Sequence, residues 1–239
     1  MDNPSYVTLS RQSGLLKDLN VIANNLANMS TEGFRRESVA FTEVLKRLDV
    51  QGGSISQADA RARFTDFSQA ELHQTGGSLD FAIEGDGFFL IETPSGPALT
   101  RNGAFARSVD GELVTSDGDR VLGEGEAPLF FPADAEKIEV AADGTISADG
   151  QPIGQIALVT VADKSALIRQ GSGLFTTEEG VAPADAASLF HGYVEKSNVD
   201  PVREITRMIE VQRLYEMGQS FLSTEDERMR QVIRVMGGG

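Results

Sequence analysis

The sequence contains no cysteine and no tryptophan, and only two of its 239 residues are histidine. Without cysteine the chain can form neither disulfides nor thiolate metal sites, so cysteine usage indicates no cellular compartment. Neither His73 nor His191 has a second histidine or a carboxylate at metal-ligand spacing, and both are interpreted as surface or packing residues. We therefore expect no enzyme activity, no metal and no cofactor. A carboxylate pair of the glycosidase kind leaves no sequence signature and stays an open alternative.

Long apolar runs are absent as well. No stretch reaches the roughly 18 apolar residues that a membrane-spanning helix requires. The segment from Met1 to Arg11 lacks the basic region and apolar core of a cleavable signal peptide. Taken alone, these two absences predict a cytoplasmic protein without a membrane span.

Positive charge is scarce in the middle of the chain. The net charge is −15, and residues 51–194 account for most of it with eight basic and 22 acidic side chains. Residues 1–50 carry six of each sign, and residues 195–239 carry seven basic and eight acidic side chains. An acidic middle repels phosphate backbones, which excludes nucleic acid as an expected partner. The nearly neutral ends can pack against copies of themselves without strong charge repulsion.

A long helix is predicted near the N-terminus, from about Pro4 to Asn28, because proline is favourable at a first helical position. One apolar stripe follows its length at steps of four and three residues: Leu15, Leu19, Ile22, Leu26 and Met29. Asn24, Asn25 and Asn28 crowd the end of this helix, and Gly33 supplies a position where the chain can reverse. From spacing alone, an ordinary helix end with a polar exit is the favoured interpretation.

A second helix is predicted at the C-terminal end, capped by either Ser197 or Asp200. Apolar residues then recur at every seventh position: Met208, Tyr215, Leu222, Met229 and Met236. The same stripe is broadened by Val211, Val232, Leu214, Phe221 and Val235, and interrupted by Gly218 and Glu225. A stripe this broad indicates more than one neighbour, although a core helix packed within its own domain is the alternative.

Between the two predicted helices the sequence falls into two stretches of different character, residues 36–75 and the residues from Gly76 onward. Residues 36–75 are interpreted as a connecting arm whose form, a short helix or an extended segment, the sequence leaves open. From Gly76 short apolar runs alternate with turn dipeptides: Asn102-Gly103, Asp110-Gly111, Asp117-Gly118, Asp143-Gly144 and Asp149-Gly150. This density of hairpin signals predicts an antiparallel β domain, whose strand pattern ends near Ala187. The fold class we expect is therefore α+β.

Three blocks of sequence resemble the bacterial flagellar rod and hook proteins. The first is their N-N-x-A-N, T, G-F-[KR] signature, which is matched by Asn24, Asn25, Ala27, Asn28, Thr31, Gly33, Phe34 and Arg35. The second is their G-G-x-L-D-x-A-I-x-G-x-G-F-F block, matched over residues 76–89 and followed by T-R-N-G-A-F at residues 100–105. The third is their S-N-V-D and Q-R-x-Y-E block near the end, matched by Glu195, Ser197, Asn198, Val199, Glu204, Met208, Ile209, Gln212, Arg213, Tyr215 and Glu216. The resemblance covers nearly the whole chain.

The resemblance implies a structural subunit of the basal-body rod. In such a subunit, residues 1–35 and 199–239 would form a helical assembly domain that pairs in a coiled-coil-like inner layer. Residues 36–75 would form the connecting arm and residues 76–198 a β-rich outer domain. The implied assembly is a tubular drive shaft in the periplasm that transmits torque and surrounds the export channel. Its partners would be further copies, other rod proteins and the flagellar export apparatus, which exports such subunits uncleaved.

The assembly interface that we expect consists of Leu15, Leu19, Ile22, Asn24, Asn25, Leu26, Asn28, Gly33, Phe34, Met208, Val211, Tyr215, Leu222 and Met229. Within the family, the compact arm and the start Y-V-T-L-S-R-Q favour the proximal rod type over the distal rod type. Hook proteins are much longer than this chain. A soluble binding module, such as an adhesin or a chaperone, is the alternative from a different class, and it would form a closed oligomer or a monomer rather than an open helix.

Overall fold

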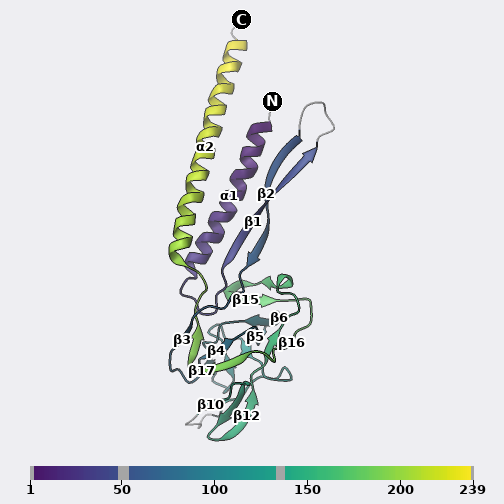
Figure 1. The fold of residues 1–239 in the computed structure, drawn as a ribbon, viewed down its shortest axis with the longest axis vertical. Coiled ribbons are helices and arrows are strands. Elements are labelled where there is room, and N and C mark those ends of the chain that lie inside the picture. The colour runs from purple at the N-terminus through teal and green to yellow at the C-terminus, as the bar shows by residue number, and fades with distance from the viewer. Residues whose placement is uncertain (1–2, 48–53, 133–137, 238–239) are drawn as a thin grey trace. The chain divides into compact units, whose positions relative to one another are not determined.

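A computed structural model describes residues 3–47, 54–132 and 138–237 of the protein (Figure 1). Contacts divide the chain into two compact units. The first unit combines Met1–Ala27, Glu37–Asp66 and Val199–Gly239, and the second combines Asn28–Arg36 with Phe67–Asn198. The division of the chain into residues 1–35 with 199–239, 36–75 and 76–198 stays a prediction about domains.

The first unit contains the two long helices, α1 (Asn3–Ala27) and α2 (Pro201–Gly237). The bounds of α1 agree with the predicted helix to within one residue at each end. At the start of α2, the carboxylate of Asp200 accepts hydrogen bonds from the backbone N–H groups of Val202 (3.0 Å) and Arg203 (3.1 Å). Asp200 is therefore the capping residue, and of the two caps that the sequence allowed it is the one used.

The two helices are antiparallel neighbours. Asn25 near the end of α1 contacts Glu204 in the first turn of α2, and Gln12 contacts Tyr215 further along. Since α2 has 37 residues and α1 has 25, α2 is longer by roughly 18 Å at 1.5 Å per residue. Figure 1 shows α2 continuing beyond the first residues of α1.

A β-hairpin completes the first unit, where the sequence left the form of the arm open. Strand β1 (Glu37–Arg47) pairs antiparallel with β2 (Ser54–Thr65), and both contact α1. The sequence of β2 alternates Ala58, Ala60, Ala62 and Phe64 with polar residues, which is the period of a strand. This alternation was the signal for a strand within the predicted arm.

The second unit consists of short strands, and every strand pairing in its described residues is antiparallel. Its largest sheet has the order β14-β15-β6-β5-β9-β8-β7, with β13 joining β5 to β16. The strands of this sheet are β5 (Phe88–Thr93), β6 (Gly96–Thr100), β7 (Ala106–Arg107), β8 (Leu113–Val114), β9 (Arg120–Val121), β13 (Leu158–Thr160), β14 (Ile168–Arg169), β15 (Leu174–Thr176) and β16 (Ala182–Pro183). Short 3-10 helices lie at η1 (Lys164–Ala166) and η2 (Gly171–Gly173). The predicted α+β fold class and the antiparallel β domain are confirmed.

The second unit also contains three smaller sheets. They are β10-β11-β12 (Ile138–Val140, Thr145–Ala148 and Gln151–Gln155), β17 with β4 (Ser188–His191 and Phe81–Glu84), and β18 with β3 (Tyr193–Glu195 and Leu72–Gln74). The expectation that the strand pattern ends near Ala187 was wrong. Strands β17 and β18 follow that residue, and their partners β4 and β3 lie more than 100 residues earlier in the chain. A pairing of such long sequence separation leaves no local signal.

Strand β5 lies in the middle of the largest sheet of the second unit, which we call the β unit, and it is buried on both faces. Phe89 and Ile91 join one apolar cluster, whereas Phe88 and Leu90 join a second one, as the alternation of side chains along a strand requires. Phe88 and Phe89 are among the largest fully buried side chains of the protein. The run F-F-L-I therefore holds the two clusters together.

Four of the five predicted turn dipeptides are turns with a glycine at positive φ, namely Gly111, Gly118, Gly144 and Gly150. The fifth, Asn102-Gly103, was wrong as a hairpin, because β6 and β7 on either side of it do not pair with each other. There the carbonyl of Gly103 accepts a hydrogen bond from the N–H of Phe81 at 2.9 Å. A Cβ at position 103 would lie 1.7 Å from the Phe81 carbonyl oxygen, so this glycine permits a close approach of two backbones.

Candidate assembly surface

The apolar stripes predicted on the two helices meet within one chain. Leu15 and Ile22 of α1 and Val211 of α2 form a buried cluster, against which Leu19, Met208 and Tyr215 pack half-buried. These six predicted interface residues therefore bury much of their apolar surface inside the subunit. Their contacts with a neighbouring subunit stay a prediction.

Asn25 is the polar centre of the helix end, and its side chain is fully buried. Its Nδ2 donates to the carbonyl oxygen of Glu37 (2.8 Å) and to Oε2 of Glu204 (3.2 Å), while its Oδ1 accepts from the N–H of Glu37 (2.9 Å). One amide thus joins the end of α1, the start of β1 and the first turn of α2. Glu204 is also fully buried, and a carboxylate is favourable near the N-terminus of a helix.

The other predicted residues at this helix end differ in exposure. Asn24 is exposed, whereas Leu26 and Asn28 are half-buried. The Oδ1 of Asn28 accepts a hydrogen bond from the hydroxyl of Thr31 at 3.1 Å, and its carbonyl accepts from the N–H of Thr31 at the same distance. Asn28 and Thr31 therefore form the turn that ends the helix, as expected of a polar exit.

Two polar contacts between α1 and α2 were not predicted. Asp18, which is buried, forms an ion pair with Arg207 at 3.1 Å. The buried amide of Gln12 donates to the carbonyl oxygen of Tyr215 at 2.9 Å. Gly218 makes room for this amide, because a Cβ there would lie 2.0 Å from Nε2 of Gln12. The glycine that interrupts the apolar stripe of α2 thus admits a hydrogen bond between the helices.

Helix α2 keeps further apolar faces that α1 does not cover. Leu214, Met217 and Phe221 follow one another at steps of three and four, and they are 38%, 60% and 43% exposed. At about 100° per residue they lie roughly a quarter turn away from Val211. A third group, Val202, Ile205 and Ile209, is exposed on yet another side of the helix. Toward its end, α2 exposes Met229, Val232, Ile233, Val235 and Met236, whereas Leu222 is half-buried.

The helix exit, Asn28–Arg36, belongs to the second unit and packs against the β domain. Gly33 has φ +68°, and a Cβ there would lie 2.2 Å from the backbone nitrogen of Asn102. The N–H of Gly33 donates to the carbonyl oxygen of Glu195 at 2.7 Å. Phe34 is buried, and the guanidinium of Arg169 lies 4.7 Å from the centroid of its ring. Gly33 and Phe34 therefore attach the exit to the β domain of the same chain.

A buried charge cluster lies beside this attachment. Glu195 accepts from Arg35 at 2.7 Å, from Arg101 at 3.3 Å and from the N–H of Ala70 at 2.8 Å. Arg101 also donates to the carbonyl oxygen of Ile83 at 3.2 Å. Burial lowers the pKa of Arg101 to about 10, with Glu195 acting in the opposite direction. Two guanidinium groups thus share one carboxylate in the interior of the β unit.

Sequence reasoning did not select Gln12, Asp18, Arg35, Glu37, Arg101, Glu195 and Glu204 as site residues. All seven are buried. Their polar character suggested exposure, and only the pairing of segments far apart in the chain shows why they are inside. Charged residues within the family-like blocks were the one signal that could have identified Arg35, Arg101, Glu195 and Glu204.

Histidine and carboxylate side chains do not gather into a metal site in the described residues. Among residues 3–47, 54–132 and 138–237, no group of three or more histidine and carboxylate side chains is placed to hold a metal ion. His191 packs on the ring of Phe81 with 5.6 Å between centroids, and its Nε2 lies 3.0 Å from the carbonyl oxygen of Ser78. No helix in the described part of the chain is long and apolar enough to cross a membrane.

Three family models match this chain. Residues 6–35 match the flagella basal body rod protein family. Residues 82–148 match the flagellar hook protein FlgE/F/G D1 domain, and residues 191–235 match the flagellar basal body rod FlgEFG protein C-terminal family. The two helices and the β domain thus define a structural protein of the flagellar rod and hook class, which is not an enzyme.

Relatives match over almost the whole chain. The flagellar basal-body rod protein FlgF of Caulobacter vibrioides is 35% identical, over 99% of this chain and 99% of its own length. FlgF of Rhizobium meliloti is 34% identical, over 100% of this chain and 99% of its own length. The flagellar basal-body rod protein FlgG of Bacillus subtilis is 33% identical, over 96% of this chain and 97% of its own length. The chain belongs to the flagellar basal-body rod protein family, which implies a structural role in the flagellar basal body.

Proposed function

We propose that this protein is a subunit of the proximal rod, of FlgF type, which polymerises through its terminal helices. The assembled tube would act as a drive shaft that transmits torque and surrounds the channel for exported flagellar proteins. Its partners would be further copies, other proteins of the proximal and distal rod, and the flagellar export apparatus. The subunit would reach the periplasm through that apparatus and without a cleaved signal peptide.

The exposed apolar faces of α2 carry this proposal. Burying a side chain of the size of leucine, methionine or phenylalanine contributes roughly 1.5 to 3 kcal/mol, so Leu214, Met217 and Phe221 are costly to leave in water. They lie on a different side of the helix from Val211, which already packs against α1. A helix with one face covered inside the subunit and other apolar faces exposed suits head-to-tail contacts that continue from copy to copy.

The contacts within the first unit support a defined pairing of the helices. The ion pair of Asp18 with Arg207 and the hydrogen bonds of Asn25 and Gln12 fix the register of α1 against α2. In the assembly the two helices would pair as a coiled-coil-like layer. Met229 and Leu222, toward the longer end of α2, would then contact a neighbouring copy. Asn24, Asn28 and Leu26 would do so at the opposite end of the helix pair.

The relatives favour the proximal type over the distal type. The three FlgF relatives are 34 to 35% identical and cover 99 to 100% of this chain, whereas the FlgG relatives are 32 to 34% identical and cover 88 to 96%. FlgG, the distal rod type, stays the second candidate because the helix-end signature is shared by both types.

A complementation experiment distinguishes the two candidates. The gene would be expressed in two strains of one bacterium, one lacking FlgF and the other lacking FlgG, and swimming would be measured for both. The proposal predicts rescue of the strain that lacks FlgF and no rescue of the strain that lacks FlgG. The opposite pattern would assign the chain to the distal rod. A protein that rescues neither strain, yet binds a partner as a monomer, would instead be a soluble binding module.

A further inference from the structure

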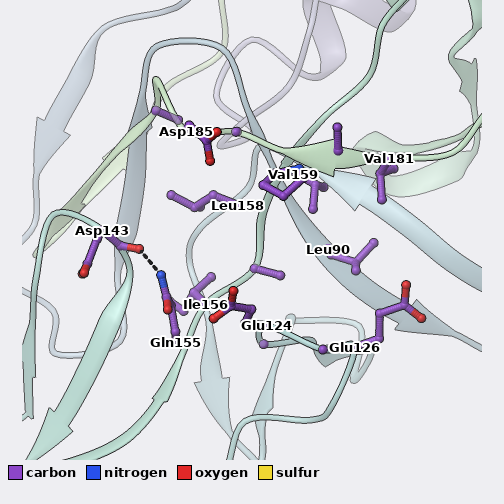
Figure 2. A pocket seen from close by; sticks show the side chains of 17 residues that line it. Leu90, Glu124, Glu126, Asp143, Gln155, Ile156, Leu158, Val159, Val181 and Asp185 are labelled. Atoms are coloured by element: carbon purple, nitrogen blue, oxygen red, sulfur yellow. Dashed lines mark hydrogen bonds between the residues drawn. The ribbon is translucent and has the colours of Figure 1, made fainter.

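A groove of about 440 Å³ opens on the β unit (Figure 2). Its apolar floor includes Leu90, Ile156 and Val159, which are buried, and the half-buried Leu158. The floor is formed where β5 and β13 pair. This groove lies wholly within the second unit.

The rim of the groove is acidic. Glu124, Glu126 and Asp185 are exposed at its mouth, and the lining contains no lysine, arginine or histidine. In the described part of the chain, none of these three carboxylates forms an ion pair. The surrounding chain offers little compensation, since residues 67–198 carry seven basic and 21 acidic side chains. An uncompensated negative rim over an apolar floor attracts a cation that carries an apolar stem.

The groove is formed by hydrogen-bonded backbone. The turn that carries Glu124 and Glu126 is closed by hydrogen bonds from Glu126 N–H to the Gly123 carbonyl (3.0 Å) and from Glu124 N–H to the Gln155 carbonyl (2.9 Å). The opposite wall is held by the N–H of Ala184, which donates to the carbonyl of Leu158 at 2.9 Å. Because its walls are fixed, binding would require little ordering of the groove itself.

We propose that this groove is a docking site for a basic segment of a partner protein, in which a lysine or arginine lies beside an aliphatic residue. The aliphatic side chain would cover Leu158 and Val159, while the cation would lie between Glu124, Glu126 and Asp185. All three carboxylates and Val181 at the mouth are exposed. A groove this open favours a segment on another protein surface over a small molecule, which a site would need to enclose.

The test uses the full chain with labelled methyl groups and follows Leu90, Ile156, Val159 and Val181 by NMR. The probes are acetyl-Leu-Lys-Val-amide, its matched control acetyl-Leu-Glu-Val-amide, and free lysine. We expect the lysine peptide to shift these four methyl signals in a saturable way, with at least tenfold weaker shifts from the other two probes. Raising the salt concentration should weaken the binding, since the carboxylates are exposed.

The triple variant Glu124→Gln/Glu126→Gln/Asp185→Asn should lower the affinity for the lysine peptide at least tenfold. The matched control, Asp117→Asn/Glu178→Gln/Glu179→Gln, removes the same number of exposed charges outside the groove and should leave the affinity unchanged. Equal binding of both peptides, equal binding of free lysine, or no shift at millimolar peptide would overturn the proposal. Polymerisation through α2 does not involve this groove, so either proposal can fail without the other.

Discussion

Arg35 donates from Nη2 to Oε1 of Glu195 across 2.7 Å, with neither side chain exposed to solvent. Arg35 closes the exit from the first helix, and Glu195 ends the last strand before the second helix. The pair thus holds together two chain segments 160 residues apart, one of which follows α1 while the other precedes α2. We therefore expect the pair to stabilise the second unit by fixing these two segments to each other.

Removing one partner of the pair should destabilise the protein strongly. Glu195→Ala leaves two buried guanidinium groups without their shared carboxylate, and such a loss typically costs about 3 to 5 kcal/mol. Arg35→Ala should cost less, because Arg101 still contacts Glu195. Denaturant unfolding measures both free energies of unfolding. Lys196→Ala, which breaks the exposed pair with Glu71, serves as the control and should change stability by no more than about 1 kcal/mol.

Two glycines with nearly the same φ allow backbone strain to be separated from steric overlap. Gly33→Ala and Gly76→Ala both place a side chain at positive φ, +68° and +73°, which costs about 1 to 2 kcal/mol. Only the Cβ at position 33 would meet backbone, 2.2 Å from Asn102 N, whereas position 76 is open. Gly33→Ala should therefore destabilise the protein by at least about 2 kcal/mol more than Gly76→Ala in denaturant unfolding. Equal costs would mean that the overlap relaxes freely.

Asn25→Ala should destabilise the first unit. The substitution removes the buried amide that contacts the Glu37 backbone and the Glu204 carboxylate, at roughly 1 to 3 kcal/mol for each buried group that loses this hydrogen bond. Asn24→Ala, at the exposed neighbouring position, is the matched control and should have a much smaller effect. Hydrogen exchange of the α2 amides near Glu204 would locate the loss. Equal destabilisation by both variants would show that the buried hydrogen bonds of Asn25 do not stabilise the first unit.

The sequence was sufficient to predict the elements that depend on neighbouring residues. It did not predict the contacts between residues far apart in the chain. The 3.6-residue period of Leu15, Leu19 and Ile22 was sufficient to predict α1, and the Asp-Gly dipeptides were sufficient to predict most hairpins. The form of the arm was left open, although the sequence of β2 has the two-residue alternation of a strand. Strand β18 was missed because its partner β3 lies far away in the chain. Burial of Asn25, Glu195 and Glu204 was hidden for the same reason, since each contacts a residue far away in sequence.

Glu32 should make stability depend on pH. Burial raises the pKa of its carboxyl group, and Asp80 adds to the effect. At pH values above the pKa that Glu32 has in the unfolded chain, the folded state binds more protons than the unfolded state. The stability that protonated Glu32 contributes is therefore lost as the pH rises through its pKa in the folded state. Glu32→Gln should therefore raise the melting temperature at about pH 7 and leave it unchanged near pH 4. Exposed Glu178→Gln is the control for charge loss, and an equal gain at both pH values would contradict the assignment.

Incorporation of an α2 variant into basal bodies tests the polymerisation proposal most directly. Phe221→Asp in the exposed apolar face is compared with Gln219→Asp, an exposed polar position two residues away. Both proteins are first shown to have the same helix content and melting temperature as monomers. Detergent-extracted basal bodies from cells that carry only the variant are then labelled for this protein and imaged by electron microscopy. The account predicts labelled rods with Gln219→Asp and none with Phe221→Asp, whereas equal labelling would contradict assembly through this face of α2.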